Sequence, residues 1–214
     1  MIVRPPNTRV PEPGPPEETD DQLSPRVVRS LIFADVAGFS KLSDEELPRF
    51  NDVVLSALGR VLARYDDAID YRNTWGDALY AVTHDPNAAA ACAMDLQQTM
   101  KGIHLTRHKL PDHLALRLGA HIGPVFPTQD PLIGGDAFMG SHVSRTARIE
   151  PVTPPGAVYV TDAFAAALAL AQSKYSCDYV GHMPAAKGYG NLRMYRLRAP
   201  VRAVATTPGS RSPA

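Results

Sequence analysis

Two aspartates in this sequence each end a strand-like run and stand beside small residues. Asp35 closes the apolar, β-branched run VVRSLIFAD, and Asp77 follows Gly76 after the run AIDYRNTW. Small neighbours let a ligand come close to the backbone. Two carboxylates that face one point, with few other candidate ligands, suit a hard divalent ion such as Mg²⁺ or Mn²⁺. On spacing alone, turn residues that bond to nearby backbone are the commoner explanation.

Three basic side chains could bind a phosphate group. Arg145 and Arg148 fall with Ser144 in the helix-like run GSHVSRTARIE, and Lys187 begins the run KGYG. Each also has an ordinary explanation, a solvated helix face for the arginines and a plain turn for the lysine. The sequence motifs of P-loop nucleotide-binding proteins, dinucleotide-binding folds, serine hydrolases and zinc proteases are absent.

The composition predicts one globular domain with tails. The chain has 214 residues, of which 44% are hydrophobic, and this is enough for a core. Its 22 basic and 22 acidic residues balance, so no overall field favours nucleic acid or an anionic membrane. No apolar run approaches the ~20 residues that span a bilayer, and we see no signal peptide. We therefore expect a cytoplasmic protein that binds no nucleic acid and does not insert into membranes.

Both ends of the chain have the composition of tails. Residues 1–26 are rich in proline and acidic residues, cannot bury a core, and should form a flexible arm. Residues 199–214 are predicted to be a second flexible tail, slightly basic in character. The folded part is therefore expected to be residues 27–198.

Within the folded part, hydrophobic patterns and turn signals predict the elements that must position these side chains. Asp85 is expected to cap one helix, and the run 114–126 is expected to be a pair of strands bent at Gly119 and Gly123. The other predicted strands are 27–36, 68–75, 78–83, 156–161 and 192–197, and the predicted helices are 43–65, 85–102, 140–150 and 162–172. This order predicts an α+β fold with helices packed on one face of a mainly antiparallel sheet.

Six segments, read in order, resemble the class III nucleotidyl cyclase catalytic domains. The resemblance covers about residues 30–197, nearly the whole folded part, and six ordered segments are more specific than any one of them. It implies a ferredoxin-like class III cyclase fold. The segments are LIFADVAGFSKLS, NTWGDALYAV, LRLGAHIGPVF, FMGSHVSRTARIE, PGAVYVTDAF and AKGYG.

The resemblance also implies roles for individual residues. Asp35 and Asp77 match the two metal aspartates of that family, and the carbonyl of Val36 would add a backbone ligand. Two Mn²⁺ or Mg²⁺ ions per site are implied. Arg148 matches the arginine that stabilises charge on the transferring phosphate, and Lys187 matches the lysine that binds the triphosphate. The family's sites lie at the interface of a head-to-tail homodimer, so a homodimer is implied here.

The sequence departs from the purine cyclase pattern at three positions. Asn73 stands where adenylate cyclases carry a lysine, four residues before the second metal aspartate. Ala137 stands where they carry an aspartate, with Asp136 one place away, and Ser144 replaces a ribose-positioning asparagine. The purine-reading pair is therefore missing or shifted, and Ser144 or Arg145 would have to replace the asparagine.

The run around Asn73 offers groups that could read a smaller base. Tyr71, Asn73 and Trp75 alternate onto one strand face, where large rings would narrow a pocket, and the Asn73 amide can both donate and accept. Arg72 could donate to a pyrimidine carbonyl, but in a regular strand it points away from Tyr71, so one of the two must leave the pocket. Simple core packing is the competing explanation for Tyr71 and Trp75.

The runs YRNTWGDALY, GSHVSRTARIEPVTPPG and AKGYG are most similar to the pyrimidine cyclases of bacterial Pycsar antiphage systems. That resemblance implies a uridylate cyclase that converts UTP to cyclic UMP in antiviral defence, and a separate effector that senses the product. This resemblance is the only ground for favouring uracil over cytosine. Three alternatives stay open: a cytidylate cyclase, an ordinary adenylate or guanylate cyclase, and a non-catalytic cyclase-homology module that dimerises or senses nucleotide.

Overall fold

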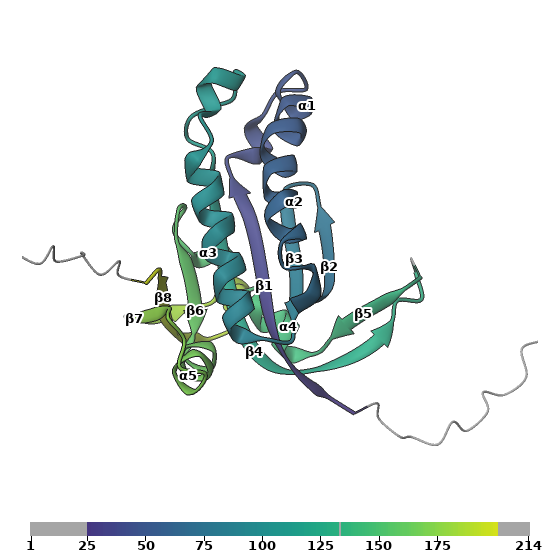
Figure 1. Cartoon of the computed structure of the whole chain (residues 1–214), viewed down its shortest axis with the longest axis vertical. Coiled ribbons are helices and arrows are strands. Elements are labelled where there is room, and N and C mark those ends of the chain that lie inside the picture. The colour runs from purple at the N-terminus through teal and green to yellow at the C-terminus, as the bar shows by residue number, and fades with distance from the viewer. Residues whose placement is uncertain (1–24, 133, 201–214) are drawn as a thin grey trace, which may run out of the picture.

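The computed structural model describes residues 25–132 and 134–200 of the chain. The two predicted tails, 1–26 and 199–214, lie outside the described residues except for 25–26 and 199–200. The described part forms one mixed sheet covered by helices (Figure 1). No helix in this part is long and apolar enough to cross a membrane.

The sheet runs in the order β2-β3-β1-β4-β6-β8-β7, and β5 pairs with β4 off this path. Neighbouring strands are antiparallel except for the parallel pair β4–β6. The prediction of an α+β fold with a mainly antiparallel sheet is therefore confirmed. The strands are β1 (Val27–Ala37), β2 (Ile69–Trp75), β3 (Ala78–Thr83), β4 (Ala115–Gln129), β5 (Asp136–Met139), β6 (Val158–Thr161), β7 (Ser176–Pro184) and β8 (Asn191–Arg198).

The helices begin largely where the local signals predict. Asp85 caps α3 by accepting hydrogen bonds from the N–H groups of Asn87 (2.9 Å) and Ala88 (3.2 Å), and Pro86 occupies the first turn. The predicted helix 43–65 is α1 and α2 joined through a π-helical turn. The helices are α1 (Glu46–Phe50), the π-turn (Asn51–Leu55), α2 (Ser56–Ala63), α3 (Pro86–Gly102), α4 (Ser141–Thr146) and α5 (Asp162–Leu170), with 3-10 turns at Phe39–Lys41, Asp66–Ala68, Leu105–His108, Glu150–Val152 and Ala186–Gly188.

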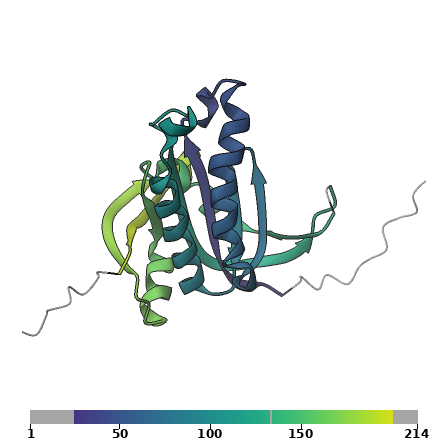
Figure 2. The same ribbon diagram turned by 45° about the horizontal axis from the view of Figure 1, so that its top comes forward.

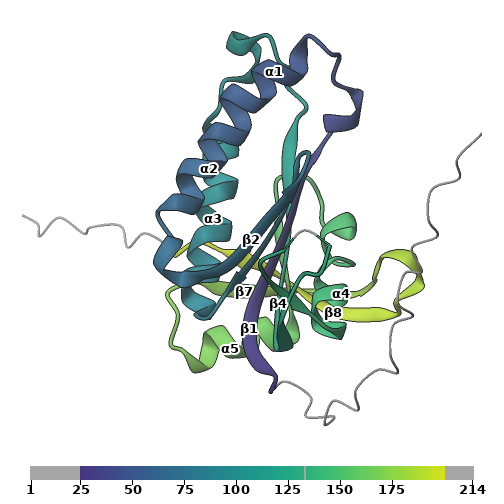
Figure 3. The ribbon, with the colours of Figure 1, turned by 90° about the vertical axis from the view of Figure 1, so that its right-hand side faces the viewer.

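Helices cover both faces of the sheet, so the expectation that all helices pack on one face is wrong. Alternate residues of β1 point to opposite faces, as in any strand. Ile32 belongs to the main core under α2, α3 and α5, whereas Leu31 packs in a second cluster against Val82 and Val125, with Val143 of α4 beside it. Figure 2 shows α2 and α3 side by side across the sheet, and Figure 3 shows α4 on the other side of the strands.

The run 114–126 is not a bent pair of strands, because β4 continues unbroken through both glycines. Gly119 and Gly123 instead give the α4 segment room to approach β4. A Cβ atom at Gly119 would lie 2.8 Å from the backbone nitrogen of Glu150, and one at Gly123 would lie 2.1 Å from Nδ1 of His142. The sequence analysis therefore counted β4 as two strands, and it missed β5 and β7.

A chain of hydrogen bonds fastens α4 to the sheet at Gly123. His121, buried at 1% exposure in β4, contacts Thr161 through Nδ1 and His142 of α4 through Nε2, both at 2.7 Å. The hydroxyl of Thr161 also accepts the N–H of Phe164 (3.4 Å) and so caps α5. Burial, with smaller effects from His142 and Arg145, lowers the pKa of His121 to about 3. The imidazole is therefore neutral at ordinary pH.

We predict opposite effects on stability from an alanine at two glycines. Gly123→Ala should lower the free energy of unfolding by about 1–3 kcal/mol, because the added carbon displaces the His142 ring. Gly59→Ala should raise it by about 1 kcal/mol, because Gly59 lies inside α2 and its added carbon meets no atom within 4 Å. Urea unfolding of the two variants checks this, and a shift in the same direction for both contradicts it.

We also predict that acid weakens the fold through His121. Because its pKa is about 3 in the folded chain and 6.5 in a model peptide, the unfolded chain binds more protons between these values. The contribution of His121 to the free energy of unfolding should therefore fall by about 2 kcal/mol between pH 7 and pH 5. The carboxyl groups of Asp77 and Glu150, whose pKa values are raised in the folded chain, act in the opposite direction over the same range.

Urea unfolding at pH 7 and pH 5 measures that loss. His121→Gln should be less stable than the wild type at pH 7, and this difference should change in favour of the variant by about 2 kcal/mol at pH 5. His104→Gln, a change at an exposed histidine outside this network, should keep the wild-type dependence. Equal pH dependence for His121→Gln and the wild type would show that His121 is not the source of acid sensitivity.

Candidate active site

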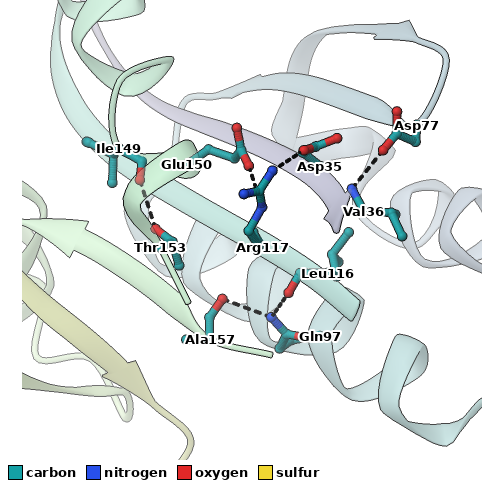
Figure 4. Close-up of polar contacts among 10 residues, drawn as sticks. All are labelled: Asp35, Val36, Asp77, Gln97, Leu116, Arg117, Ile149, Glu150, Thr153 and Ala157. Atoms are coloured by element: carbon teal, nitrogen blue, oxygen red, sulfur yellow. Dashed lines mark hydrogen bonds and ion pairs between the residues drawn. The ribbon is translucent and has the colours of Figure 1, made fainter. Parts of the chain in front are cut away.

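Asp35 and Asp77, which lie forty-two positions apart in the sequence, meet at one point of the structure. Asp35 lies near the end of β1, and Asp77 lies in the turn between β2 and β3, where Gly76 has a left-handed φ of 61°. Since β3 pairs with β1, this turn is brought beside Val36, whose N–H donates to Oδ2 of Asp77 at 3.0 Å (Figure 4). The two carboxyl groups are close enough for the charge of Asp35 to act on Asp77.

The two carboxyl groups differ in their affinity for a proton. Burial, followed by the hydrogen bond with Asp35 and its charge, raises the pKa of Asp77 to about 7. Partial burial also acts to raise the pKa of Asp35, but hydrogen bonds from Asp77 and Arg117 outweigh it, and that pKa is lowered. The pair therefore shares one proton near neutral pH, as like charges at close range require.

Arg117 is a site residue that sequence reasoning missed. It pairs with Asp35 across the β1–β4 ladder, and its guanidinium forms ion pairs with Asp35 and, at 3.0 Å, with Glu150 (Figure 4). Burial raises the pKa of Glu150 to about 7, and Arg117 opposes that rise. The signal in the sequence was a single arginine inside the otherwise apolar run LRLGAHIG of β4.

The donor set around Asp35 and Asp77 fits a hard divalent cation. A hollow of about 150 Å³ lies against both carboxyl groups, with the chain from Val36 to Ser40 and Arg117 on its wall. Among the described residues, no group of three or more acidic, histidine or cysteine side chains is placed to hold a metal. Mg²⁺ commonly takes one or two carboxylates and completes its shell with water and substrate phosphates. A cation would also replace the proton that the pair now shares.

Arg148 and Lys187 are brought into one neighbourhood through the backbone. The carbonyl of Arg148 accepts the N–H of Ala186 at 3.1 Å, so the loop that carries Lys187 lies against the end of the α4 segment. Lys187 is exposed and has a left-handed φ of 57°. The Tyr189 hydroxyl donates to the carbonyl of Ser141 at 3.5 Å and holds the same loop to α4. Within the described residues neither cation forms an ion pair with Asp35 or Asp77.

Ser144 is exposed on α4, whereas Arg148 lies in the turn that follows the end of this helix. Helical spacing therefore does not place Ser144 and Arg148 on one face. The Arg145 guanidinium lies over the Tyr189 ring, 6.0 Å from the centroid. Of the two residues considered as substitutes for an asparagine, Arg145 is thus held against Tyr189 and Ser144 is the exposed one.

The four predicted base-reading residues of β2 do not lie together. Arg72 forms an ion pair with Asp66 on the side of the sheet that faces α2. Its side chain therefore lies on the opposite face from Asn73. Tyr71 packs edge-on against Tyr80 (5.6 Å between centroids) and Phe138 (6.2 Å), beside the second hydrophobic cluster. Tyr71 therefore serves core packing, which was its alternative explanation.

Asn73 and Trp75 line a hollow of about 400 Å³ on the face of the sheet that carries Asp35. Trp75 is 90% exposed. The sequence analysis missed two further aromatic residues on this wall, Phe33 and Tyr80, whose rings stack with centroids 4.6 Å apart. The Tyr80 hydroxyl is buried and has no hydrogen-bond partner among the described residues. The hollow thus combines flat apolar walls with the side-chain amide of Asn73.

Comparisons with known proteins agree with this geometry. The family model described as the adenylate and guanylate cyclase catalytic domain matches residues 25–199. The guanylate cyclase domain of RhGC from Catenaria anguillulae, solved with GTP, is 19% identical with a TM-score of 0.68, over 81% of this chain and 97% of that one. No curated protein matches the chain.

Two other solved structures are similar to a comparable degree. The adenylyl cyclase CyaB from P. aeruginosa is 16% identical with a TM-score of 0.66, over 83% of this chain and 96% of that one. A guanylyl cyclase domain of the RhoGC fusion protein from Blastocladiella emersonii, described as a non-canonical dimer, is 19% identical with a TM-score of 0.59, over 80% of this chain and 96% of that one. At these identities, the likeness to solved structures shows the fold.

Proposed function

Because the chain belongs to the adenylate and guanylate cyclase catalytic domains, we propose that it is a pyrimidine nucleotide cyclase that favours UTP. The reaction would convert UTP to 3′,5′-cyclic UMP and pyrophosphate. The observation that carries the cyclase chemistry is the convergence of Asp35 and Asp77, of which Asp77 accepts a hydrogen bond from the Val36 N–H and Asp35 forms an ion pair with Arg117. A non-catalytic module would have no need to keep this pair.

The chain's own residues supply charge and position. Asp35, Asp77 and the Val36 carbonyl would hold two Mg²⁺ or Mn²⁺ ions, which activate the ribose 3′-hydroxyl and neutralise the leaving pyrophosphate. Asp77 gives up the shared proton when the cations bind, and Arg117 keeps Asp35 ionised and oriented. In-line attack by the substrate's own hydroxyl needs no protein nucleophile, so the absence of a catalytic triad from the sequence is expected.

Arg148 and Lys187 would stabilise the negative charge that grows on the phosphates in the transition state. In one chain they lie beside each other and make no ion pair with the metal aspartates. This arrangement supports a head-to-tail homodimer, in which one chain offers Asp35 and Asp77 and its partner offers Arg148 and Lys187.

The proposal of a pyrimidine rests on the hollow beside Asn73 and on the sequence resemblance. Asn73 can donate and accept, and its Oδ1 now accepts the Thr74 N–H at 2.7 Å. Asp136, the acid nearest the purine-reading position, bonds to Gln129 on the β4–β5 arm. The choice of uracil over cytosine, the role in antiphage defence and a separate effector that senses the product rest on the Pycsar resemblance alone.

A purine cyclase is the second candidate, because the solved neighbours are named as guanylyl and adenylyl cyclases. It would use the same metal, arginine and lysine residues, and only the base pocket would differ. Product identity therefore separates the two candidates, whereas loss of activity in a metal-site variant does not.

We predict cyclic UMP as the main product when the purified chain is incubated with Mn²⁺ and each of UTP, CTP, GTP and ATP, with products identified by mass spectrometry. Asp35→Asn and Asp77→Asn should each lose at least about a thousandfold in rate, since each removes a cation ligand. Asp52→Asn, at an exposed acid on the π-turn, is the matched control and should keep wild-type activity. Cyclic AMP or cyclic GMP would reject the pyrimidine proposal, and no product from any nucleotide would reject the enzyme.

We further predict that Asn73 and Arg72, although adjacent, differ in their effect on base choice. Asn73→Ala should change the ratio of kcat/KM between UTP and the other nucleotides by at least about tenfold, because it removes a polar contact to the base. Arg72→Ala should leave that ratio unchanged, because its side chain pairs with Asp66 on the other face. An equal effect of both variants would place the base elsewhere.

A further inference from the structure

An apolar cavity of about 190 Å³ lies between α2 and the β2–β3 hairpin, on the opposite face of the sheet from the hollow beside Asn73. In Figure 1, α2 lies directly over β3 and β2. The walls are the inner face of the helix, the hairpin, and three core residues from β1, α3 and β4. The lining residues are Ala34, Leu55, Leu58, Gly59, Leu62, Thr74, Gly76, Asp77, Ala78, Leu79, Leu96 and Leu116.

The cavity exists because one side chain is missing from a regular stripe. Leu55, Leu58, Gly59 and Leu62 follow the i, i+3, i+4, i+7 spacing by which a helix covers a core. The glycine interrupts this stripe, and a Cβ atom there would meet no atom within 4 Å. Gly59 is exposed, so it forms an open mouth. The π-turn that ends at Leu55 adds a second irregularity, of the kind often found at functional sites.

The lining chemistry selects a small neutral molecule. Besides backbone, only Thr74 and Asp77 bring polar atoms, and the Asp77 carboxyl group is already bonded to the Val36 N–H and to Asp35. An engineered apolar cavity of about 150 Å³ in another protein stays dry and binds benzene. We propose that this cavity is a binding site for a neutral molecule with one aromatic ring and at most one hydroxyl group, which would lie toward Thr74.

A ligand in this cavity would contact the turn that carries the candidate metal ligand. Gly76, Asp77 and Ala78 all line the space, so the occupant packs against the backbone that sets the Asp77 position. A bound molecule would therefore affect the position of Asp77 in the candidate active site, although it would lie in a different space from the nucleotide. This consequence rests on the proposed function, whereas binding itself does not.

The test is a titration of the full chain with phenol, without nucleotide or metal, followed by ¹H–¹⁵N NMR. We expect saturable shifts of the Gly59, Gly76 and Ala78 amides. Gly59→Leu, whose side chain closes the mouth, should weaken binding at least tenfold. Gly102→Leu is the matched control and should bind as the wild type does, because Gly102 also lies in a helix with open space around it but away from the cavity.

Leu55→Phe fills the same cavity from another position of the stripe and should weaken phenol binding to the same extent. This second variant keeps the test valid if Gly59→Leu does not fold. The inference is overturned if no saturable shift occurs up to the solubility of phenol, or if both cavity-filling variants bind as the wild type does. Because no nucleotide is present, the result is independent of the cyclase assay. A chain that binds phenol but makes no cyclic nucleotide would overturn the proposed function alone.

Discussion

The contact between Asp35 and Asp77 is the interaction on which the candidate site depends. Two neighbouring carboxylates repel each other, and the Val36 N–H, which donates to Asp77, and the Arg117 guanidinium, which pairs with Asp35, offset this repulsion. The pKa of Asp77 is raised as a consequence of burial and of the nearby Asp35. Such a pair stabilises the fold poorly, because each group loses hydration and only one can be charged at low cost. The arrangement fits a preformed cation site, since a bound divalent ion would offset the repulsion between the two carboxylates.

A second constraint is the close approach of α4 to β4. Gly119 and Gly123 leave no side chain in the way, and the histidine pair His121–His142 fastens the helix at that point. The end of the α4 segment then carries Arg148 to the loop of Lys187, which is bonded to it through Ala186. Both cationic residues therefore depend on two glycines that lie in the middle of a continuous strand.

The β2–β3 hairpin serves both faces of the sheet. On one face Asn73 and Trp75 line an open hollow beside the Asp35 side of β1, and on the other face Thr74 closes the apolar cavity under α2. Asp77 lies in the turn that joins the two strands, so it touches both environments. Alternation along one short strand thus places the side chains of Asn73 and Thr74 on opposite faces of the sheet, although they are neighbours in sequence.

The sequence alone determined the elements whose signals are local. The β1 strand, the Gly76–Asp77 turn and the Asp85 cap depend on a few adjacent residues, and the ordered motifs predicted Asp35 and Asp77 as the candidate metal ligands. Tertiary structure decided what depends on strand register. It placed Arg117 opposite Asp35, sent Arg72 to the face under α2, and paired the half-exposed β7 with β8. These outcomes follow from pairings between distant segments, and a register is set by the packing of the whole sheet, which no local run of residues contains.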